Sequence, residues 1–408
     1  MTTAVLVAGL LGSMVLLISV GNVDAFAAPT FAGRITGVLF VLAGFTEGIS
    51  AIAALDYGGK REWRYSGATV LVGTLITLAS NAIFLWMWFE VREYGTPLLP
   101  VFVTLTVWSL WGIWLLFNEK AWKGFPSPKG FAVGVTLTAV FTGANLAYSS
   151  MYQPSAALTR IDGTADFGKP VVVQDMIHLP VTFQVRNSGT IPVYVLHSLF
   201  SVSGEQYKFT GPEYGTVKRP MWQEDLENDQ DVDLYSKSPV SILISTGYFV
   251  NPGAWLGPGD KISLVKVVHI PRIAPYQTIY AKTRVVTMRR DRGDFRTFEV
   301  KNDYSWNSTH GVSEECEKPP CDGRVRFQTY VRNVNNIINV TRTPRLLTAF
   351  WWMKGDGNDS DVHANIRSRN ADGNLSSKFE DNRRYGVEAY ESGAIALPFQ
   401  TLLTPPPK

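Results

Sequence analysis

Residues 35–55 read ITGVLFVLAGFTEGISAIAAL, a run of 21 residues in which Glu47 is the only charged side chain. A helix rises about 1.5 Å per residue and the hydrocarbon core of a bilayer is about 30 Å thick, so a run of this length crosses a membrane as a helix. Four further stretches have the same apolar character. Together they predict five transmembrane helices, over residues 4–20, 35–55, 68–89, 98–117 and 131–151.

The density of charge changes near residue 151. Residues 1–151 contain 8 Lys/Arg and 7 Asp/Glu, whereas residues 152–408 contain 30 and 28. We therefore expect the first part to lie in the lipid bilayer and the second part in water. The net charge of +3 produces no strong field of one sign, so no nucleic-acid partner is expected.

The loops between the apolar stretches predict the orientation, because Lys and Arg are retained on the cytoplasmic side. Two alternate loops contain six basic residues, and the other two contain two: Lys60, Arg61, Arg64, Lys120, Lys123 and Lys129, against Arg34 and Arg92. The prediction is a multi-pass protein of the cytoplasmic membrane, with its N-terminus inside and residues 152–408 outside.

The first apolar stretch has a second interpretation. It is followed by Ala25-Phe26-Ala27, which is typical of a signal peptide cleaved after Ala27. The residues before the stretch, Met1-Thr2-Thr3, lack the positive charge of a signal peptide. An uncut helix is therefore favoured, and cleavage would leave four spans.

Two polar residues lie far from either end of their predicted helices, Glu47 in the second and Asn81 in the third. Ionisable groups at that depth are costly and are candidates for function. One interpretation is a protonated Glu47 that bonds Asn81, Thr46 or another helix and so holds the bundle together. The other is a proton or ion path, although no second buried acid or base accompanies Glu47.

Small residues recur at a spacing of four in the second helix, as Gly33-x-x-x-Gly37 and Gly44-x-x-x-Gly48. Such spacing lets helix backbones approach closely. We expect close packing within one chain rather than a dedicated dimer interface.

After residue 155 the hydrophobic period becomes alternating. Val181-Thr-Phe-Gln-Val-Arg186 alternates apolar with polar residues, the turn residues Asn187-Ser-Gly189 follow, and a second strand is expected at 191–196. Six further runs rich in β-branched and aromatic residues predict strands at 240–250, 261–270, 278–288, 295–300, 325–340 and 346–353. Helical periodicity is nearly absent, which favours an antiparallel β-sandwich.

The strand that ends in Asn187-x-Gly189, with Pro258-Gly-Asp260 before a later alternating strand, resembles the immunoglobulin-like sandwiches of extracytoplasmic bacterial proteins over about residues 168–290. The resemblance implies a fold and a display role, and no activity. The expected organisation is a helical bundle over 1–151, a sandwich over 152–301, a second β-rich region or an extension of the sandwich over 302–403, and a disordered tail over 404–408.

Outside the membrane, Cys316 and Cys321 are expected to form a disulfide. Two acidic stretches offer oxygen ligands for calcium, but neither matches the twelve-residue calcium loop, so solvated loops are favoured. The weak calcium candidates are Asp229, Asp231, Asp233, Asp356, Asn358 and Asp361.

No hydrolase, phosphate-binding or metalloprotease motif is present, and the five histidines are scattered, so no catalytic residue and no cofactor are predicted. The favoured hypothesis is a non-enzymatic protein that displays its outer region for binding, sensing or assembly with a membrane or envelope protein. One alternative is a transporter or channel subunit that uses Glu47 and Asn81. Another is an extracytoplasmic enzyme without a recognisable motif. The oligomeric state does not follow from the sequence.

Overall fold

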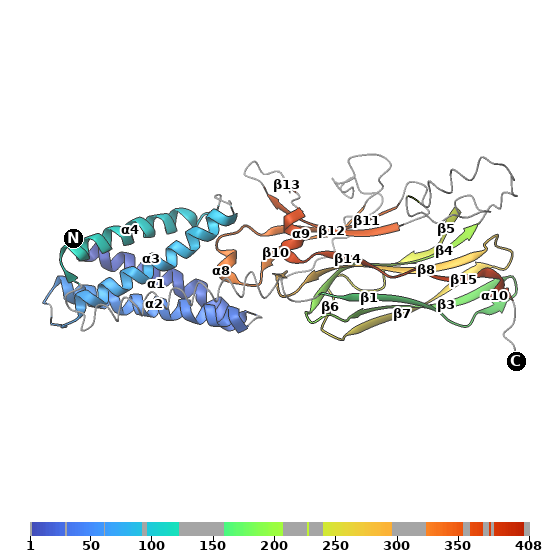
Figure 1. Cartoon of the computed structure of the whole chain (residues 1–408), viewed down its shortest axis with the longest axis horizontal. Coiled ribbons are helices and arrows are strands. Elements are labelled where there is room, and N and C mark those ends of the chain that lie inside the picture. Colours follow the sequence, from blue (N-terminus) through green and yellow to red (C-terminus); the bar gives the residue numbers. More distant parts are fainter. Residues whose placement is uncertain are drawn as a thin grey trace.

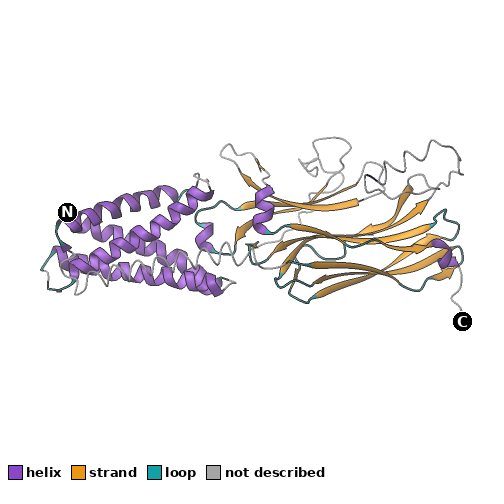
Figure 2. Ribbon diagram, in the orientation of Figure 1, coloured by secondary structure: helices purple, strands orange, loops and turns teal. Residues whose placement is uncertain are grey.

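Four long helices form the N-terminal part of the chain in the computed structural model (Figures 1 and 2). The structure describes residues 2–28, 31–60, 62–91, 96–121, 159–206, 227, 240–295, 324–353, 360–369, 375–376 and 379–403. The helices are α1 (Thr2–Ala27), α2 (Phe31–Gly58), α3 (Ser66–Val91) and α4 (Leu99–Asn118). All four are long and apolar enough to span a membrane, and each contains one of the first four predicted stretches almost entirely. The fifth predicted helix, 131–151, lies outside the described residues.

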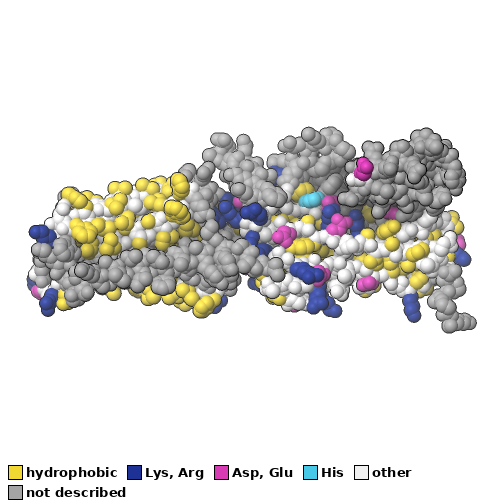
Figure 3. Space-filling model, viewed as in Figure 1, with side chains coloured by type: hydrophobic (Ala, Val, Ile, Leu, Met, Phe, Trp, Pro, Cys, Tyr) yellow, Lys and Arg dark blue, Asp and Glu magenta, His cyan; other side chains and the backbone are white. Residues whose placement is uncertain are grey.

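The outer surface of the bundle is apolar, as lipid requires. Large side chains are exposed around it, among them Trp86 (72% exposed) and Phe45 (56%). In Figure 3 the visible face of the helical part is mainly hydrophobic, and Lys and Arg gather at the end away from the strands. A helix that is hydrophobic on all sides is typical of a membrane span.

The bundle has two distinct ends. Apolar residues of all four helices pack at the end that faces the β-rich region, including Val20, Phe40, Phe84 and Phe102, and we call this the junction end. A second cluster packs towards the other end, called here the far end. The N-terminus and the end of α4 lie at the far end (Figure 1).

Helices α1 and α2 are in very close contact through glycines. A Cβ atom on Gly37 of α2 would lie 2.2 Å from the backbone nitrogen of Ala25 and 2.7 Å from the carbonyl oxygen of Gly21, both on α1. Gly44 and Gly48 face Ile18 and Met14 of α1 in the same way. The small residues at spacing four therefore serve packing within the chain, as the sequence predicts.

The described residues of the β-rich region form three antiparallel sheets. The first has β1 (Ile161–Phe167), β2 (Val171–Val173), β3 (Met176–Asn187) and β7 (Lys261–Pro271). The second has β4 (Val193–Gln206), β5 (Val240–Gly247), β6 (Trp255–Leu256), β8 (Thr278–Arg289), β14 (Glu388–Glu391) and β15 (Ile395–Pro398). The third has β9 (Gly293–Asp294), β10 (Arg324–Asn333), β11 (Arg345–Met353), β12 (Ser360–Arg369) and β13 (Leu375–Ser376). Within the described ranges, short helices accompany these sheets as α8 (Asn336–Asn339), α9 (Phe379–Tyr385) and α10 (Phe399–Leu403).

The sheets are stacked in three layers, with the second sheet in the middle (Figures 1 and 2). One core lies between the first and second sheets and includes Phe183 and Phe200, whose rings stack at 4.7 Å. Another core lies between the second and third sheets and includes Leu196 and Leu347. Ten consecutive residues at the start of β4 are buried because both of its faces are covered. The antiparallel β-rich region is confirmed, whereas the immunoglobulin-like sandwich is not.

Two sequence predictions change in this region. The turn at Asn187–Gly189 is present and links β3 to β4, but these strands belong to different sheets. The Asn187 side chain donates to the carbonyl oxygens of Ile191 and Leu256. The predicted strand 325–340 is wrong over its second half, because β10 ends at Asn333 and residues 336–339 form helix α8.

Candidate functional site

Glu47 lies in a polar cluster that three helices of the bundle share. The residue is fully buried on α2. Its Oε1 atom accepts hydrogen bonds from the hydroxyl of Ser13 on α1, at 3.0 Å, and of Thr77 on α3, at 2.7 Å. The Thr77 hydroxyl also lies 3.0 Å from the carbonyl oxygen of Gly73. One carboxyl group thus connects α1, α2 and α3 at a depth where polar groups are costly unless they are bonded.

Two buried atoms near this cluster have no hydrogen-bond partner among the described residues, Oε2 of Glu47 and Nδ2 of Asn81. Asn81 is 2% exposed and follows Thr77 by four residues, so it lies one turn further along the same face of α3. Thr46, the other partner considered from the sequence, donates to the carbonyl oxygen of Leu42 instead. The bundle therefore contains an uncompensated carboxyl oxygen and an uncompensated amide donor.

A second polar site joins the bundle to the β-rich region. Asp24, in the last turns of α1, is 1% exposed. Its carboxylate accepts hydrogen bonds from the backbone N–H groups of Asn336, at 2.6 Å, and Ile337, at 2.8 Å, which open α8. In return, the Asn336 side chain donates to the carbonyl oxygen of Val20 at 3.2 Å. A carboxylate at the start of a helix satisfies N–H groups that have no partner within the helix.

Apolar packing completes this junction. Ile337 and Ile338 are 1% and 5% exposed, and they belong to the same core as Leu17, Phe84 and Trp88 of the bundle. Two isoleucines of the β-rich region thus enter the junction end of the helical bundle. Burial of such side chains contributes about 1.5–3 kcal/mol each, so the two parts are joined by a packed contact in addition to the chain connection.

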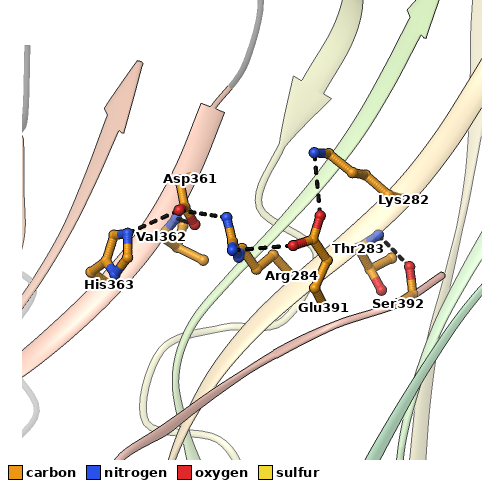
Figure 4. Close-up of polar contacts among 8 residues, drawn as sticks. All are labelled: Lys282, Thr283, Arg284, Asp361, Val362, His363, Glu391 and Ser392. Carbon is orange, nitrogen blue, oxygen red and sulfur yellow. Dashed lines mark hydrogen bonds and ion pairs between the residues drawn. The ribbon is translucent and has the colours of Figure 1, made fainter. Parts of the chain in front are cut away.

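A network of charged residues crosses from the second sheet to the third (Figure 4). Arg284 of β8 forms ion pairs with Asp361 of β12 and with Glu391 of β14, the latter at 3.1 Å. Lys282 also pairs with Glu391, at 3.3 Å. On the other side, Nε2 of His363 donates to Asp361 at 2.9 Å.

The environment of Asp361 alters its acidity. Burial raises the pKa of this carboxyl group, but the hydrogen bond from His363, the charges of His363 and Arg284, and the N–H of Val362 outweigh burial and hold the pKa below its ordinary value of 3.8. Asp361 therefore stays ionised at neutral pH and has its oxygens engaged by these partners.

The remaining site residues expected from the sequence lie outside the described residues. These are Cys316 and Cys321, and the calcium candidates Asp229, Asp231, Asp233, Asp356 and Asn358. The disulfide and the calcium sites stay predictions. Among the described residues, no group of three or more His, Cys, Asp or Glu side chains is placed to hold a metal ion.

Two histidines that the sequence analysis treated as scattered are brought together by the first sheet. His178 of β3 and His269 of β7 are register partners, and their Nδ1 atoms lie 2.8 Å apart. They are separated by 91 residues in the chain, so only the pairing of β3 with β7 brings them close. His269 falls within the predicted strand 261–270, whereas His178 lies three residues before the predicted run 181–186, in a part of β3 that the sequence analysis missed.

No protein-family model matches the chain, and no curated protein matches it. A crystal structure of Spo0M, a sporulation control protein from Bacillus subtilis, is similar over 60% of this chain and 93% of that chain, at 8% identity and a TM-score of 0.21.

Proposed function

We propose that this chain is a multi-pass protein of the cytoplasmic membrane that holds a β-rich region in a fixed position on the outer side of the membrane, for assembly with a membrane or envelope protein and without catalysis. The observation that carries the proposal is the junction at Asp24 and α8. A domain that needs only a membrane anchor can be attached to a single helix through a flexible linker. A buried junction, with a carboxylate and two isoleucines committed to it, keeps one orientation.

The charges at the two ends of the bundle support the orientation. Lys60, Arg64 and Lys120 belong to the far end, where Tyr57 donates to Glu119 and joins the α2 and α4 ends. Arg34 belongs to the junction end, and its Nε donates to the carbonyl oxygen of Ala28. More positive charge at the far end supports a cytoplasmic position for that end and an outer position for the β-rich region.

Two predictions about the spans gain support from the same geometry. Helix α1 packs against α2 along its length and its Asp24 binds α8, as a retained helix would and a cleaved signal peptide would not. Helix α4 ends at the far end, whereas β1 begins in the β-rich region (Figure 1). A fifth span over 131–151 would return the chain to the outer side.

The test is purification from the native membrane in mild detergent, with quantitative mass spectrometry of proteins recovered in near-equal amount. The variants are wild type, Asp24→Ala and the control Ser19→Ala, which alters an exposed residue of α1. We expect one membrane or envelope protein with wild type and Ser19→Ala, and a severalfold lower yield with Asp24→Ala at equal membrane expression. Recovery of the chain alone, or equal partner yields from all three, would overturn the proposal.

A second candidate function rests on Glu47 and Asn81. Their unpartnered Oε2 and Nδ2 atoms suit a bundle that passes a proton or a cation, as a subunit of a transporter or channel. Glu47→Gln retains the Oε1 acceptor and removes the ionisable group. If this variant folds normally and abolishes ion flux in proteoliposomes, the transport function is supported. If it leaves flux unchanged, the cluster is structural.

A further inference from the structure

We propose that His178 and His269 form a surface site for a divalent transition-metal ion, copper(II) in particular, which the two imidazoles chelate together. The pair lies on the first sheet, far from the Glu47 cluster and from the α8 junction. Its two facing nitrogens are the chemical basis of the proposal, because imidazole is the commonest protein ligand for such metals.

The sheet holds the two imidazoles close together. β3 and β7 pair without a break from Met176↔Pro271 to Arg186↔Lys261, and His178↔His269 is one of these pairs. β3 is the central strand of its sheet, with β1 and β2 on its other edge. Two ligands on a continuous ladder need little ordering when a metal binds, which favours chelation.

The distance between the nitrogens suits a metal with right-angled ligands. The Nδ1 atoms are 2.8 Å apart and share a hydrogen bond, whose proton a bound metal ion would displace, with ring centroids at 4.8 Å and ring planes at 83°. With metal–nitrogen bonds of about 2.0 Å, two ligands at 90° are separated by about 2.8 Å, and two at a tetrahedral angle by about 3.3 Å. The observed separation matches the first case, which is the geometry that copper(II) prefers among nitrogen and oxygen ligands.

The surroundings leave the site open and uncharged. Both histidines lie on the outward face of the sheet, and His269 is exposed. Their neighbours along the ladder on this face are the pairs Pro180↔Val267 and Met176↔Pro271. These residues carry no charge to repel or replace a cation. No third His, Cys, Asp or Glu joins the pair within the described part of the chain, so water supplies the remaining positions.

Competition between metals favours copper. The affinity of nitrogen sites for divalent ions rises along the first transition row to copper(II) and falls again at zinc. Magnesium and calcium prefer oxygen ligands and bind such a pair poorly. The site is therefore expected to select copper(II) over zinc and to ignore magnesium and calcium.

The experiment uses the full chain in detergent micelles, purified through a tag without histidine, with one equivalent of copper(II) sulfate in a non-coordinating buffer. Electron spin-echo envelope modulation, a form of pulsed electron paramagnetic resonance, counts the imidazoles bound to copper. The variants are His178→Asn, His269→Asn and the double substitution, with Thr182→Asn as the matched control on the same face of β3. As a folding control, the unfolding transition of each of the four variants is measured without metal and compared with that of wild type.

We expect two imidazoles on copper in wild type and in Thr182→Asn. Each single histidine variant is expected to show one imidazole and an affinity at least about tenfold lower, since loss of a direct ligand exceeds the effect of losing its supporting contacts. The double variant is expected to lose the signal from this site altogether. A wild-type spectrum with one imidazole or none would overturn the proposal. Two imidazoles retained in either single variant would do the same, by locating the metal elsewhere.

Discussion

The carboxylate of Asp24 accepts a 2.6 Å hydrogen bond from the backbone N–H of Asn336, a residue 312 positions later in the chain. Helix α8 has only four residues, and the side chain of its N-cap residue, Asn335, forms no capping bond. So short a helix does not form by itself in water, because fixing the backbone of its first turn costs more conformational entropy than its few hydrogen bonds offset. Helix α8 therefore depends on Asp24 and on the apolar cluster of the bundle in which its isoleucines are buried.

Replacement of Asp24 is expected to open this junction. Asp24→Ala leaves the N–H groups of Asn336 and Ile337 buried without an acceptor, which costs about 1–3 kcal/mol. Asp24→Asn keeps one acceptor oxygen and should cost less. Unfolding in mixed detergent micelles measures the stability, and distances between spin labels on the bundle and on β8 measure the orientation. A narrow, unchanged distance distribution in Asp24→Ala would contradict this role.

The hydrogen bond from Thr77 to Glu47 is expected to stabilise the bundle measurably. Thr77→Val keeps the shape of the side chain and removes the hydroxyl, so it should cost about 0.6–1.7 kcal/mol, the range for bonds between membrane helices. Thr104→Val is the control, because Thr104 is exposed on α4 and donates to the Pro100 carbonyl of its own helix. If both variants unfold at the same mole fraction of denaturing detergent as wild type, the hydrogen bond from Thr77 to Glu47 contributes nothing to stability.

Acid is expected to weaken the contact between the second and third sheets through Asp361. The pKa of Asp361 is lower in the folded chain than its ordinary value of 3.8, so the folded state binds this proton less readily than the unfolded state. The resulting stability is fully present above about pH 5 and is lost as the pH falls below 3.8 towards the folded pKa. Asp361→Asn should therefore be less stable than wild type at pH 7, by about 1–3 kcal/mol, and the difference should shrink in acid.

Denaturation at a series of pH values from 7 to 3 tests this expectation. Asp166→Asn, which changes an exposed carboxylate on β1, serves as the control and should follow wild type. A constant difference between wild type and Asp361→Asn over the whole series would show that the Arg284 pairing does not depend on this ionisation.

Local patterns in the sequence predict the elements well and their partners poorly. Length and hydropathy identify the four described helices, and alternation identifies β3, β7 and β8. The pairing of β14 and β15 with β8 joins residues more than 100 positions apart and leaves no local signal. Strand β12 was missed because its flanks are rich in Gly, Asn, Asp and Ser. These residues are typical of loops, and only the core with β4 and β8 favours a strand there.

The candidate sites follow the same division. Glu47 and Asn81 stand out in the sequence because polar residues are rare in membrane helices. Asp24 did not stand out, since it lies near the end of its helix, where a charged residue meets water in most membrane proteins. Its partner α8 was predicted as strand, because Ile337, Ile338 and Val340 are β-branched. The relationship between them is tertiary, as is that between His178 and His269.

The contact between α1 and α2 predicts opposite effects for two glycine substitutions. The three atoms nearest to a Cβ on Gly37 are all backbone atoms of α1, the closest at 2.2 Å, so Gly37→Ala must push the helices apart at a cost of about 1–3 kcal/mol. Gly12 lies on α1 with nothing within 4 Å of a Cβ, so Gly12→Ala should stabilise the helix by up to about 1 kcal/mol. The free energy of unfolding in mixed micelles, measured for both variants, tests these opposite effects.

Gly37 also faces the backbone of Asp24, so its substitution should weaken the α8 junction as well. The weakening should be visible as a broader distribution of spin-label distances. Equal stability of Gly37→Ala and wild type would mean that the helices are not held this closely.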